Sequence, residues 1–256
     1  MPGLRLLPLG IGNAFSAVSY STCLALETDG CWLLLDCPHP IRKMMREAAA
    51  TAADHGYMVP DLDAAAVHAV VLTHLHADHV SGVEGLAFYS RFLLKRKLRL
   101  LAHPSVSEHL WSGHLAVSMG HAKREPGLPE IEYRFEDFFD LQDVDERQSV
   151  SSGPFAVSVY PAAHSLFTTA VFVEAAGRKF GYSADTAYDP RLIEWLARAD
   201  LIVHEANGGF PHTPYERLAE LPGALREKML VVQYPDGFDP PGREIELLQQ
   251  GRSYWV

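Results

Sequence analysis

Residues 67–79 read Val-His-Ala-Val-Val-Leu-Thr-His-Leu-His-Ala-Asp-His, an apolar run that ends in three histidines and one aspartate. The β-branched residues of positions 67–73 predict a buried strand. Positions 81–84, Ser-Gly-Val-Glu, match a capping box and predict a helix that starts there and runs toward Leu94. The histidine-rich residues 74–79 are therefore predicted to form a turn between a strand and a helix.

The density of imidazoles in this turn indicates a metal site. A lone histidine usually belongs to the core or the surface, but His74, His76, Asp78 and His79 would converge on one small volume. Neutral imidazole and carboxylate are ligands that suit zinc, iron or manganese. None of the three cysteines belongs to a Cys-x-x-Cys pair, so we expect them to be reduced thiols rather than disulfides.

Strand and helix patterns alternate on both sides of this turn. Asp29-Gly30 is typical of a tight turn between two strands, at residues 20–27 and 31–36. Helical spacing begins at Ile41 and stops before Gly56. Further strands are expected at residues 4–9, 98–102, 155–161, 169–175, 179–183, 201–204 and 230–233, and further helices near residues 104–111, 190–199 and 214–221. The mixture predicts a layered α/β domain with mixed sheets.

The composition is that of a globular protein. Of the 256 residues, 48% are hydrophobic and 21% are charged, which excludes disordered, collagen-like and membrane-spanning classes. The first twelve residues lack the features of a secretory signal, so we expect a cytoplasmic protein. The length fits a single domain over residues 1–256, in which the weakly patterned residues 118–152 are expected to form a lid or insertion.

The charge balance bears on the partners of the protein. Lys and Arg number 22 against 32 Asp and Glu, which gives a net charge of -10. This balance disfavours nucleic acid as a partner without excluding it, because phosphate neutralisation drives that affinity. We expect a small-molecule substrate and no membrane partner, and the sequence leaves a homodimer open.

The spacing His-x-His-x-Asp-His resembles the signature of the metallo-β-lactamase superfamily of metallohydrolases. The resemblance covers nearly the whole chain: Leu34-Leu35-Asp36 is similar to the second-strand motif, His164 falls where a third histidine ligand is expected, and Asp185 resembles the metal-bridging aspartate. The resemblance implies a four-layer αββα sandwich of two mixed β-sheets flanked by helices. It places the metals at the edge where the loops meet.

The resemblance also implies a ligand set for two divalent metal ions. One ion would be held by His74, His76 and His164, and the other by Asp78 and His79, with Asp185 reaching both. Zn²⁺ is the expected ion, with Mn²⁺ or Fe²⁺ as alternatives. Two such ions lower the pKa of a shared water toward about 7 and favour hydrolysis of an ester or phosphodiester. Asp78 is counted with the catalytic residues as well as with the ligands.

The last ligand position departs from the pattern of the superfamily. A histidine is usual at the end of a late strand, where residues 229–234 offer Gln233. A neutral amide oxygen is a weaker zinc ligand than imidazole. Three outcomes are open: Gln233 coordinates weakly, His39 in the proline-stiffened turn of residues 36–40 substitutes for it, or the second metal site is partly empty.

Two late loops resemble those of the tRNase Z branch and its phosphodiesterase relatives. They read His-Glu-Ala-Asn at residues 204–207 and Pro-His-Thr-Pro at residues 211–214. In one interpretation Glu205 orients His212, and the pair passes a proton to the leaving alkoxide. In the other, Glu205 and His204 only tie the late loops together.

Two helix starts are expected in the same half of the chain. Asp189 and Thr213 each precede a proline, so we expect them to be N-caps with proline at the first helical position. The helix after Thr213 would favour a phosphate oxygen near its N-terminus, next to His212.

Several functions compete on this evidence. A metal-dependent hydrolase of a phosphodiester, of the cyclic or small nucleotide type, fits best. A thiolester hydrolase or an iron-dependent sulfur dioxygenase on the same fold is the alternative, and Gln233 favours it modestly. A tRNase Z-like ribonuclease is a weaker alternative, because we find no Gly/Pro-rich arm for tRNA and the net charge is acidic. The intact ligand set argues against a non-catalytic binding protein.

Overall fold

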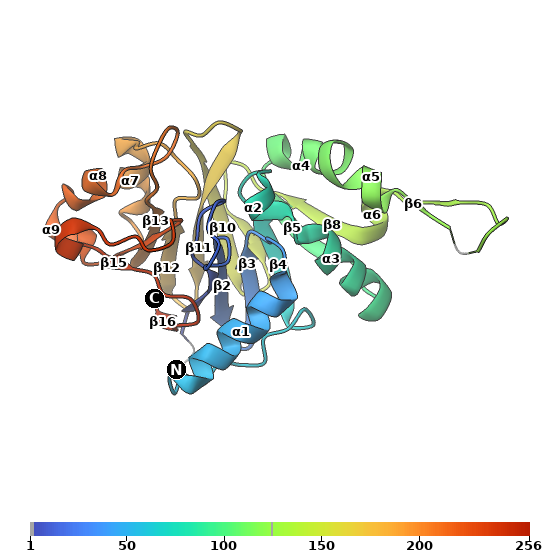
Figure 1. Cartoon of the computed structure of the whole chain (residues 1–256), viewed down its shortest axis with the longest axis horizontal. Helices are drawn as coiled ribbons and strands as arrows, with labels where there is room; N and C mark the ends of the chain where they lie inside the picture. The colour runs from blue at the N-terminus through green and yellow to red at the C-terminus, as the bar shows by residue number, and fades with distance from the viewer. Residues whose placement is uncertain (1–2, 124) are drawn as a thin grey trace.

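Two seven-stranded sheets lie face to face, and helices cover their outer faces (Figure 1). The computed structural model describes residues 3–123 and 125–256. The order of the first sheet is β16 (Tyr254–Trp255), β1 (Arg5–Gly10), β2 (Cys23–Thr28), β3 (Cys31–Leu35), β4 (Val67–Leu72), β5 (Leu98–Ala102) and β8 (Phe139–Asp143). The order of the second is β15 (Glu246–Leu247), β14 (Met229–Val232), β13 (Leu201–Glu205), β12 (Arg178–Tyr182), β11 (Thr168–Ala175), β10 (Phe155–Ala162) and β9 (Val150–Ser152). The predicted αββα sandwich is confirmed.

The sequence of β3 shows how the layers are held together. This strand is apolar on both faces, as expected where a sheet is covered on both sides. Trp32 and Leu34 pack with residues of the helices on the outer face of the first sheet. Leu33 and Leu35 point the other way and pack with residues of the second sheet. The alternation of a strand thus builds two apolar layers at once.

The parallel strands of each sheet end at the edge that carries the candidate site. Strands β3, β4, β5 and β8 run parallel in the first sheet, as do β12, β13, β14 and β15 in the second. Just beyond three of these strands, Asp36, Ala184 and Gln233 have φ angles of 63°, 51° and 64°. Residues other than glycine seldom adopt this left-handed conformation, and where they do they cluster at functional sites.

Helices cover the outside of both sheets. Along α1 (Ile41–Asp54), helical spacing buries the face that includes Ile41, Met45 and Ala52 against the first sheet. The other helices before the second sheet are α2 (Ala77–Val80), α3 (Val83–Phe88), η1 (Tyr89–Leu93), α4 (Pro104–Leu110), η2 (Trp111–Leu115), α5 (Ala116–Met119) and α6 (Phe135–Phe138). The later helices are α7 (Pro190–Leu196), α8 (Tyr215–Ala219), α9 (Gly223–Arg226) and η3 (Pro241–Arg243). Within the described ranges, no helix combines the length and the apolar character that a bilayer crossing requires.

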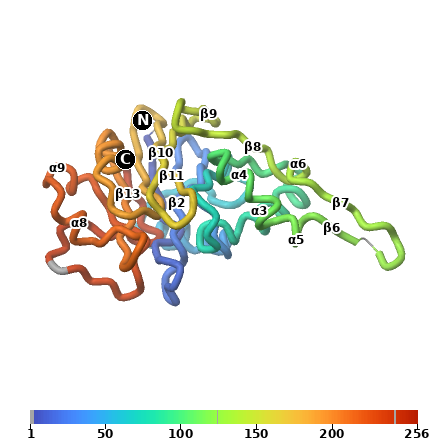
Figure 2. Tube along the Cα trace, turned by 90° about the horizontal axis from the view of Figure 1, so that it is seen from above, coloured from blue at the N-terminus to red at the C-terminus, as the bar shows by residue number. Residues whose placement is uncertain are grey.

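The weakly patterned residues 118–152 divide between a projection and the two sheets. The antiparallel strands β6 (His121–Ala122) and β7 (Ile131–Glu132) form a hairpin that extends away from the body (Figures 1 and 2). The residues after it return to the sandwich, where β8 and β9 are edge strands of the first and the second sheet.

The expected capping box after the histidine-rich turn is wrong. Ser81 lies at the end of α2, and its hydroxyl accepts a hydrogen bond from the backbone N–H of His39. Helix α3 begins at Val83 without a side-chain cap and continues through η1 to Leu93. The Ser81 hydroxyl, which the local pattern predicted to cap the helix, is therefore used in a contact with a distant segment.

The turn and the two later caps gave mixed outcomes. Asp29 and Gly30 have φ angles of 52° and 76°, as the predicted tight turn between β2 and β3 requires. Asp189 caps α7 by accepting from the backbone N–H of Arg191, as predicted. Thr213 is not a cap, because its buried hydroxyl donates to the carbonyl of Thr186 and α8 starts two residues later.

Candidate metal centre

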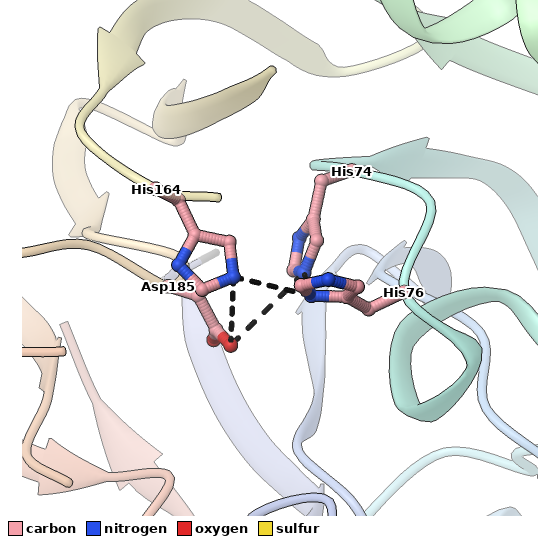
Figure 3. Close-up of side chains that lie close together, drawn as sticks. All are labelled: His74, His76, His164 and Asp185. Carbon is pink, nitrogen blue, oxygen red and sulfur yellow. Dashed lines mark hydrogen bonds and ion pairs between the residues drawn. The ribbon is translucent and has the colours of Figure 1, made fainter. Parts of the chain in front are cut away.

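Three histidines and one aspartate point at one volume (Figure 3). His76 Nδ1 lies 3.1 Å from His74 Nε2 and 3.1 Å from His164 Nε2. Asp185 Oδ2 lies 4.0 Å from His74 Nε2 and 3.9 Å from His164 Nε2. An ion bound tetrahedrally at zinc-like distances sets its ligand atoms about 3.3 Å apart. The residues of this first cluster therefore fit a zinc-type ion.

A second cluster shares Asp185 with the first. His79 Nε2 lies 3.5 Å from Asp78 Oδ2 and 3.4 Å from Asp185 Oδ1. Gln233 Nε2 lies 3.3 Å from Asp78 Oδ2 and 3.2 Å from Asp185 Oδ2. The two carboxylates, one imidazole and one amide thus surround a second point that suits a divalent cation.

Asp36 and Thr73 orient the histidines of both clusters. Asp36 Oδ2 accepts a hydrogen bond from His79 Nδ1 at 2.8 Å, which turns His79 Nε2 toward the second cluster. The Thr73 hydroxyl lies 2.8 Å from Asp36 Oδ2 and 2.9 Å from His74 Nδ1. Since a hydroxyl has one hydrogen and Asp36 accepts it, His74 Nδ1 donates to Thr73 and keeps Nε2 free. Such outer partners are typical of metal-binding histidines.

Burial sets the charge state of the first cluster. It lowers the pKa of His74 well below the usual value for histidine, and it also lowers the pKa of His76 and His164. Burial opposes ionisation of Asp185, but the attraction of His79, His74 and His164 outweighs it and lowers the pKa of that carboxyl. Neutral imidazoles around an ionised carboxylate are the protonation states that metal binding requires.

A buried acid–base pair lies next to the first cluster. Glu205 ends β13 and contacts His212 Nδ1 through both carboxylate oxygens, at 3.0 and 3.2 Å, while it accepts from the backbone N–H of Thr186. Burial raises the pKa of Glu205 to about 7, and the hydrogen bond to Glu205 raises the pKa of His212. The His212 and His164 rings are 5.2 Å apart between centroids. Both shifts favour protonation, so the pair holds a proton beside the cluster.

The remaining sequence candidates differ in their placement. Gln233 is buried in the second cluster, whereas His39 is exposed and belongs to neither of the two groups found among the described residues. His204 is buried in the core, where its Nδ1 contacts the Glu205 carbonyl, and it does not reach the clusters. The expected helix start beside His212 is displaced, because the five-residue helix α8 begins at Tyr215 and is not capped by Thr213.

Sequence reasoning missed the loop that forms one wall of the site. A pocket of about 280 Å³ is lined by residues of the clusters together with Ala14, Phe15 and Asn207. The Asn13 side chain accepts from the backbone N–H of Phe15 and donates to Asn207, so the two loops are tied together. The Asn, Ser and Ala residues of this loop between two strands form no motif from which a pocket wall could be predicted.

Comparison with known proteins finds relatives that match nearly the whole chain. The family described as Anti-Pycsar protein Apyc1 matches residues 4–254. Two relatives with this name come from Bacillus phage BSP38, 27% identical over 96% of both chains, and from Paenibacillus harenae, 29% identical over 97% of this chain and 98% of the relative.

Solved structures show the same fold at low identity. The metallo-β-lactamase fold protein YhfI from Bacillus subtilis matches with a TM-score of 0.72 and 16% identity over 100% of both chains. Zn²⁺-bound PqqB from Methylobacterium extorquens gives 0.71 and 14% over 98% of this chain and 99% of that one. The short form of human tRNase Z gives 0.67 and 16% over 98% of both. The metallo-β-lactamase fold is therefore confirmed.

Proposed function

The chain belongs to the Anti-Pycsar protein Apyc1 family, and we propose that it is a metal-dependent phosphodiesterase that acts on cyclic or small nucleotides. The role of opposing Pycsar, which the name of its relatives describes, is part of the same proposal. The observation that carries the proposal is the meeting of two ligand clusters and one proton-sharing pair at a single pocket. The ligand clusters would serve the attack on phosphorus, and the proton-sharing pair would serve the departure of the alkoxide.

The ligand clusters account for attack on the phosphorus. The ions, when bound, act as Lewis acids and activate a water molecule. His74, His76, His164 and Asp185 would hold the first ion, and Asp78, His79 and Asp185 the second. Asp185 is buried and lies within reach of both clusters, so it fixes their separation.

The Glu205–His212 pair accounts for departure of the leaving group. An alkoxide is a poor leaving group and needs a proton as the bond to phosphorus breaks. His212 donates Nδ1–H to Glu205, which leaves Nε2 to carry the transferable proton toward the pocket that His212 lines. A thiolate leaves without protonation, so a thiolester would not need this pair. The buried Glu205 carboxylate beside His212 therefore favours a phosphodiester over a thiolester. Glu205 acts as a positioning residue in this account.

The experiment compares two leaving groups in His212→Ala. Turnover of an alkyl phosphodiester should fall about 10²- to 10⁴-fold, the usual contribution of general acid catalysis. Turnover of a p-nitrophenyl diester should fall much less, because p-nitrophenolate needs little protonation. Metal content, measured on the same samples, should be unchanged. Equal losses on both substrates would remove His212 from the mechanism, and loss of metal would make it a ligand instead.

A further inference from the structure

Gln233 presents a buried polar atom that nothing so far explains. The side chain is 1% exposed, and its Oε1 has no hydrogen-bond partner among the described residues. Its Nε2 lies 3.2–3.3 Å from Asp78 Oδ2, His79 Nε2 and Asp185 Oδ2, at the centre of the second cluster. Leaving a buried acceptor unpaired destabilises the folded state, so the position of this amide calls for a ligand.

Rotation of the amide exchanges its two ends at that point. Oxygen and nitrogen of a primary amide have nearly the same shape, so a half-turn about the last side-chain bond brings Oε1 to where Nε2 lies. The second cluster then offers three oxygens, from Asp78, Asp185 and Gln233, and one nitrogen, from His79. The first cluster offers three imidazole nitrogens and one carboxylate oxygen.

The two donor sets favour different metals. Imidazole suits zinc, whereas carboxylate and carbonyl oxygens suit harder cations such as Mn²⁺. We propose that Gln233 is a ligand of the second cluster and makes it the zinc-poor half of a mixed-metal centre, in which zinc fills the three-histidine cluster first and the second cluster takes Mn²⁺. This inference rests on the proposed function for its catalytic significance, but it is tested by metal binding alone.

The test loads chelated protein with one equivalent of Zn²⁺ and excess Mn²⁺. We expect one zinc and one manganese per chain by elemental analysis, with the bound manganese visible by electron paramagnetic resonance. A second equivalent of zinc is then titrated into the sample. Gln233→His should lose manganese at about tenfold less zinc than the unsubstituted chain, since imidazole binds zinc better. Gln233→Glu, which keeps an oxygen donor, should hold manganese.

The outcomes separate this inference from the proposed function. Complete replacement of manganese by the second equivalent of zinc in the unsubstituted chain, or the same zinc titration for the unsubstituted chain and Gln233→His, would overturn the metal assignment. Melting curves of the variants identify any that fail to fold. A chain that binds zinc and manganese as stated but cleaves no phosphodiester would refute the proposed function alone.

A second inference comes from the loop between β1 and β2. The Phe15 side chain is 90% exposed although it lines the pocket beside His76 and His212. The loop that carries it is held in place, since Asp236 accepts from the backbone N–H groups of Val18 and Ser19 at 2.8 and 3.1 Å. An apolar ring that stays exposed to water forgoes the free energy that its burial would contribute to folding. Its exposure on a fixed loop therefore suggests a role in binding.

The geometry points to Phe15 as a stacking surface for the planar base of a nucleotide whose phosphodiester lies at the clusters. Stacking on an aromatic side chain requires only a flat ring and no base-specific hydrogen bond. This inference rests on the proposed function, so it is tested with a pair of ligands that share the phosphodiester: adenosine 3′,5′-cyclic phosphate and ribose 3′,5′-cyclic phosphate without a base.

Phe15→Ala should raise KM for the base-bearing ligand about fivefold or more with little change in kcat. KM for the baseless ligand should stay constant, and Phe15→Trp should restore the affinity. Val18→Ala is the matched control, because Val18 is 88% exposed on the same loop outside the pocket. Equal effects of Phe15→Ala on both ligands, or none on either, would overturn the inference. Absence of hydrolysis of both ligands by the unsubstituted chain would refute the proposed function instead, and calorimetric binding of the two ligands would then decide the role of Phe15.

Discussion

The two ligand clusters share Asp185 but are built from different chemistry. The first draws on three imidazoles, two of them just beyond β4 and the third, that of His164, more than eighty residues later. The second combines two carboxylates with one imidazole and the Gln233 amide. A single edge of one fold thus presents a nitrogen-rich and an oxygen-rich half, and in our proposal one residue at a strand end, Gln233, sets the metal preference of the second half.

The orienting residues differ between the halves in the same way. Asp36 contacts His79 directly, so it acts on the second cluster. It reaches His74 only through the Thr73 hydroxyl, which makes Thr73 the direct partner of the first cluster. Variants can therefore weaken one half more than the other.

The largest effect is expected from loss of a ligand in the first cluster. His164→Ala removes one of three imidazoles, and zinc affinity should fall by more than the about 10- to 100-fold that loss of an outer partner costs. Turnover should fall with it. Metal titration and steady-state kinetics measure both effects, with exposed His109→Ala as the control. Unchanged zinc content in His164→Ala would show that the first cluster is not built as described.

A smaller and one-sided effect is expected from Asp36→Asn. The amide oxygen can still accept from the backbone N–H of Thr73, but its NH₂ group would face His79 Nδ1 and force the proton onto Nε2. Affinity at the second cluster should fall about 10- to 100-fold, measured by manganese titration. A loss confined to the first cluster would reverse the assignment of the two orienting residues.

Thr73→Val should give the converse result and a milder one. Valine keeps the shape of threonine and the backbone N–H but removes the hydroxyl between Asp36 and His74. Zinc affinity of the first cluster should fall about tenfold, with manganese binding at the second cluster less affected. The comparison of Thr73→Val with Asp36→Asn by the same titrations would break down if both variants weakened both clusters equally.

The smallest effect is expected from His39→Ala. The ring is exposed and lies outside both clusters, so metal stoichiometry should stay the same. Elemental analysis of Gln233→Ala provides the contrast, because that variant should lose metal from the second cluster. Loss of the second metal in His39→Ala would instead make His39 the substitute ligand.

The residue patterns predicted a layered α/β domain and the local part of the centre because those depend on neighbouring residues, whereas the αββα sandwich came from the resemblance to the superfamily. His74 to His79 follow one strand directly, so their convergence could be inferred from spacing alone. His164 and Asp185 follow strands β10 and β12 of the second sheet, and only the packing of the two sheets brings them to the same edge. Their assignment depended on resemblance to a superfamily rather than on periodicity.

Tertiary contacts explain what the sequence did not predict. Ser81 and Thr213 both match local capping patterns, yet their hydroxyl groups bond to segments 42 and 27 residues away. The Phe15 loop depends on Asp236, which is more than 200 residues later in the chain. Such contacts have no signature in the local pattern and follow only from the assembled fold.

Hydrolysis of adenosine 3′,5′-cyclic phosphate before and after metal removal tests the account most directly. Chelated protein, checked by elemental analysis, should show no turnover and a lower melting temperature, because ligands stabilise the state that binds them. Restoring one equivalent of zinc with excess manganese should restore both the turnover and the melting temperature. Full turnover by protein that holds no metal would contradict the account.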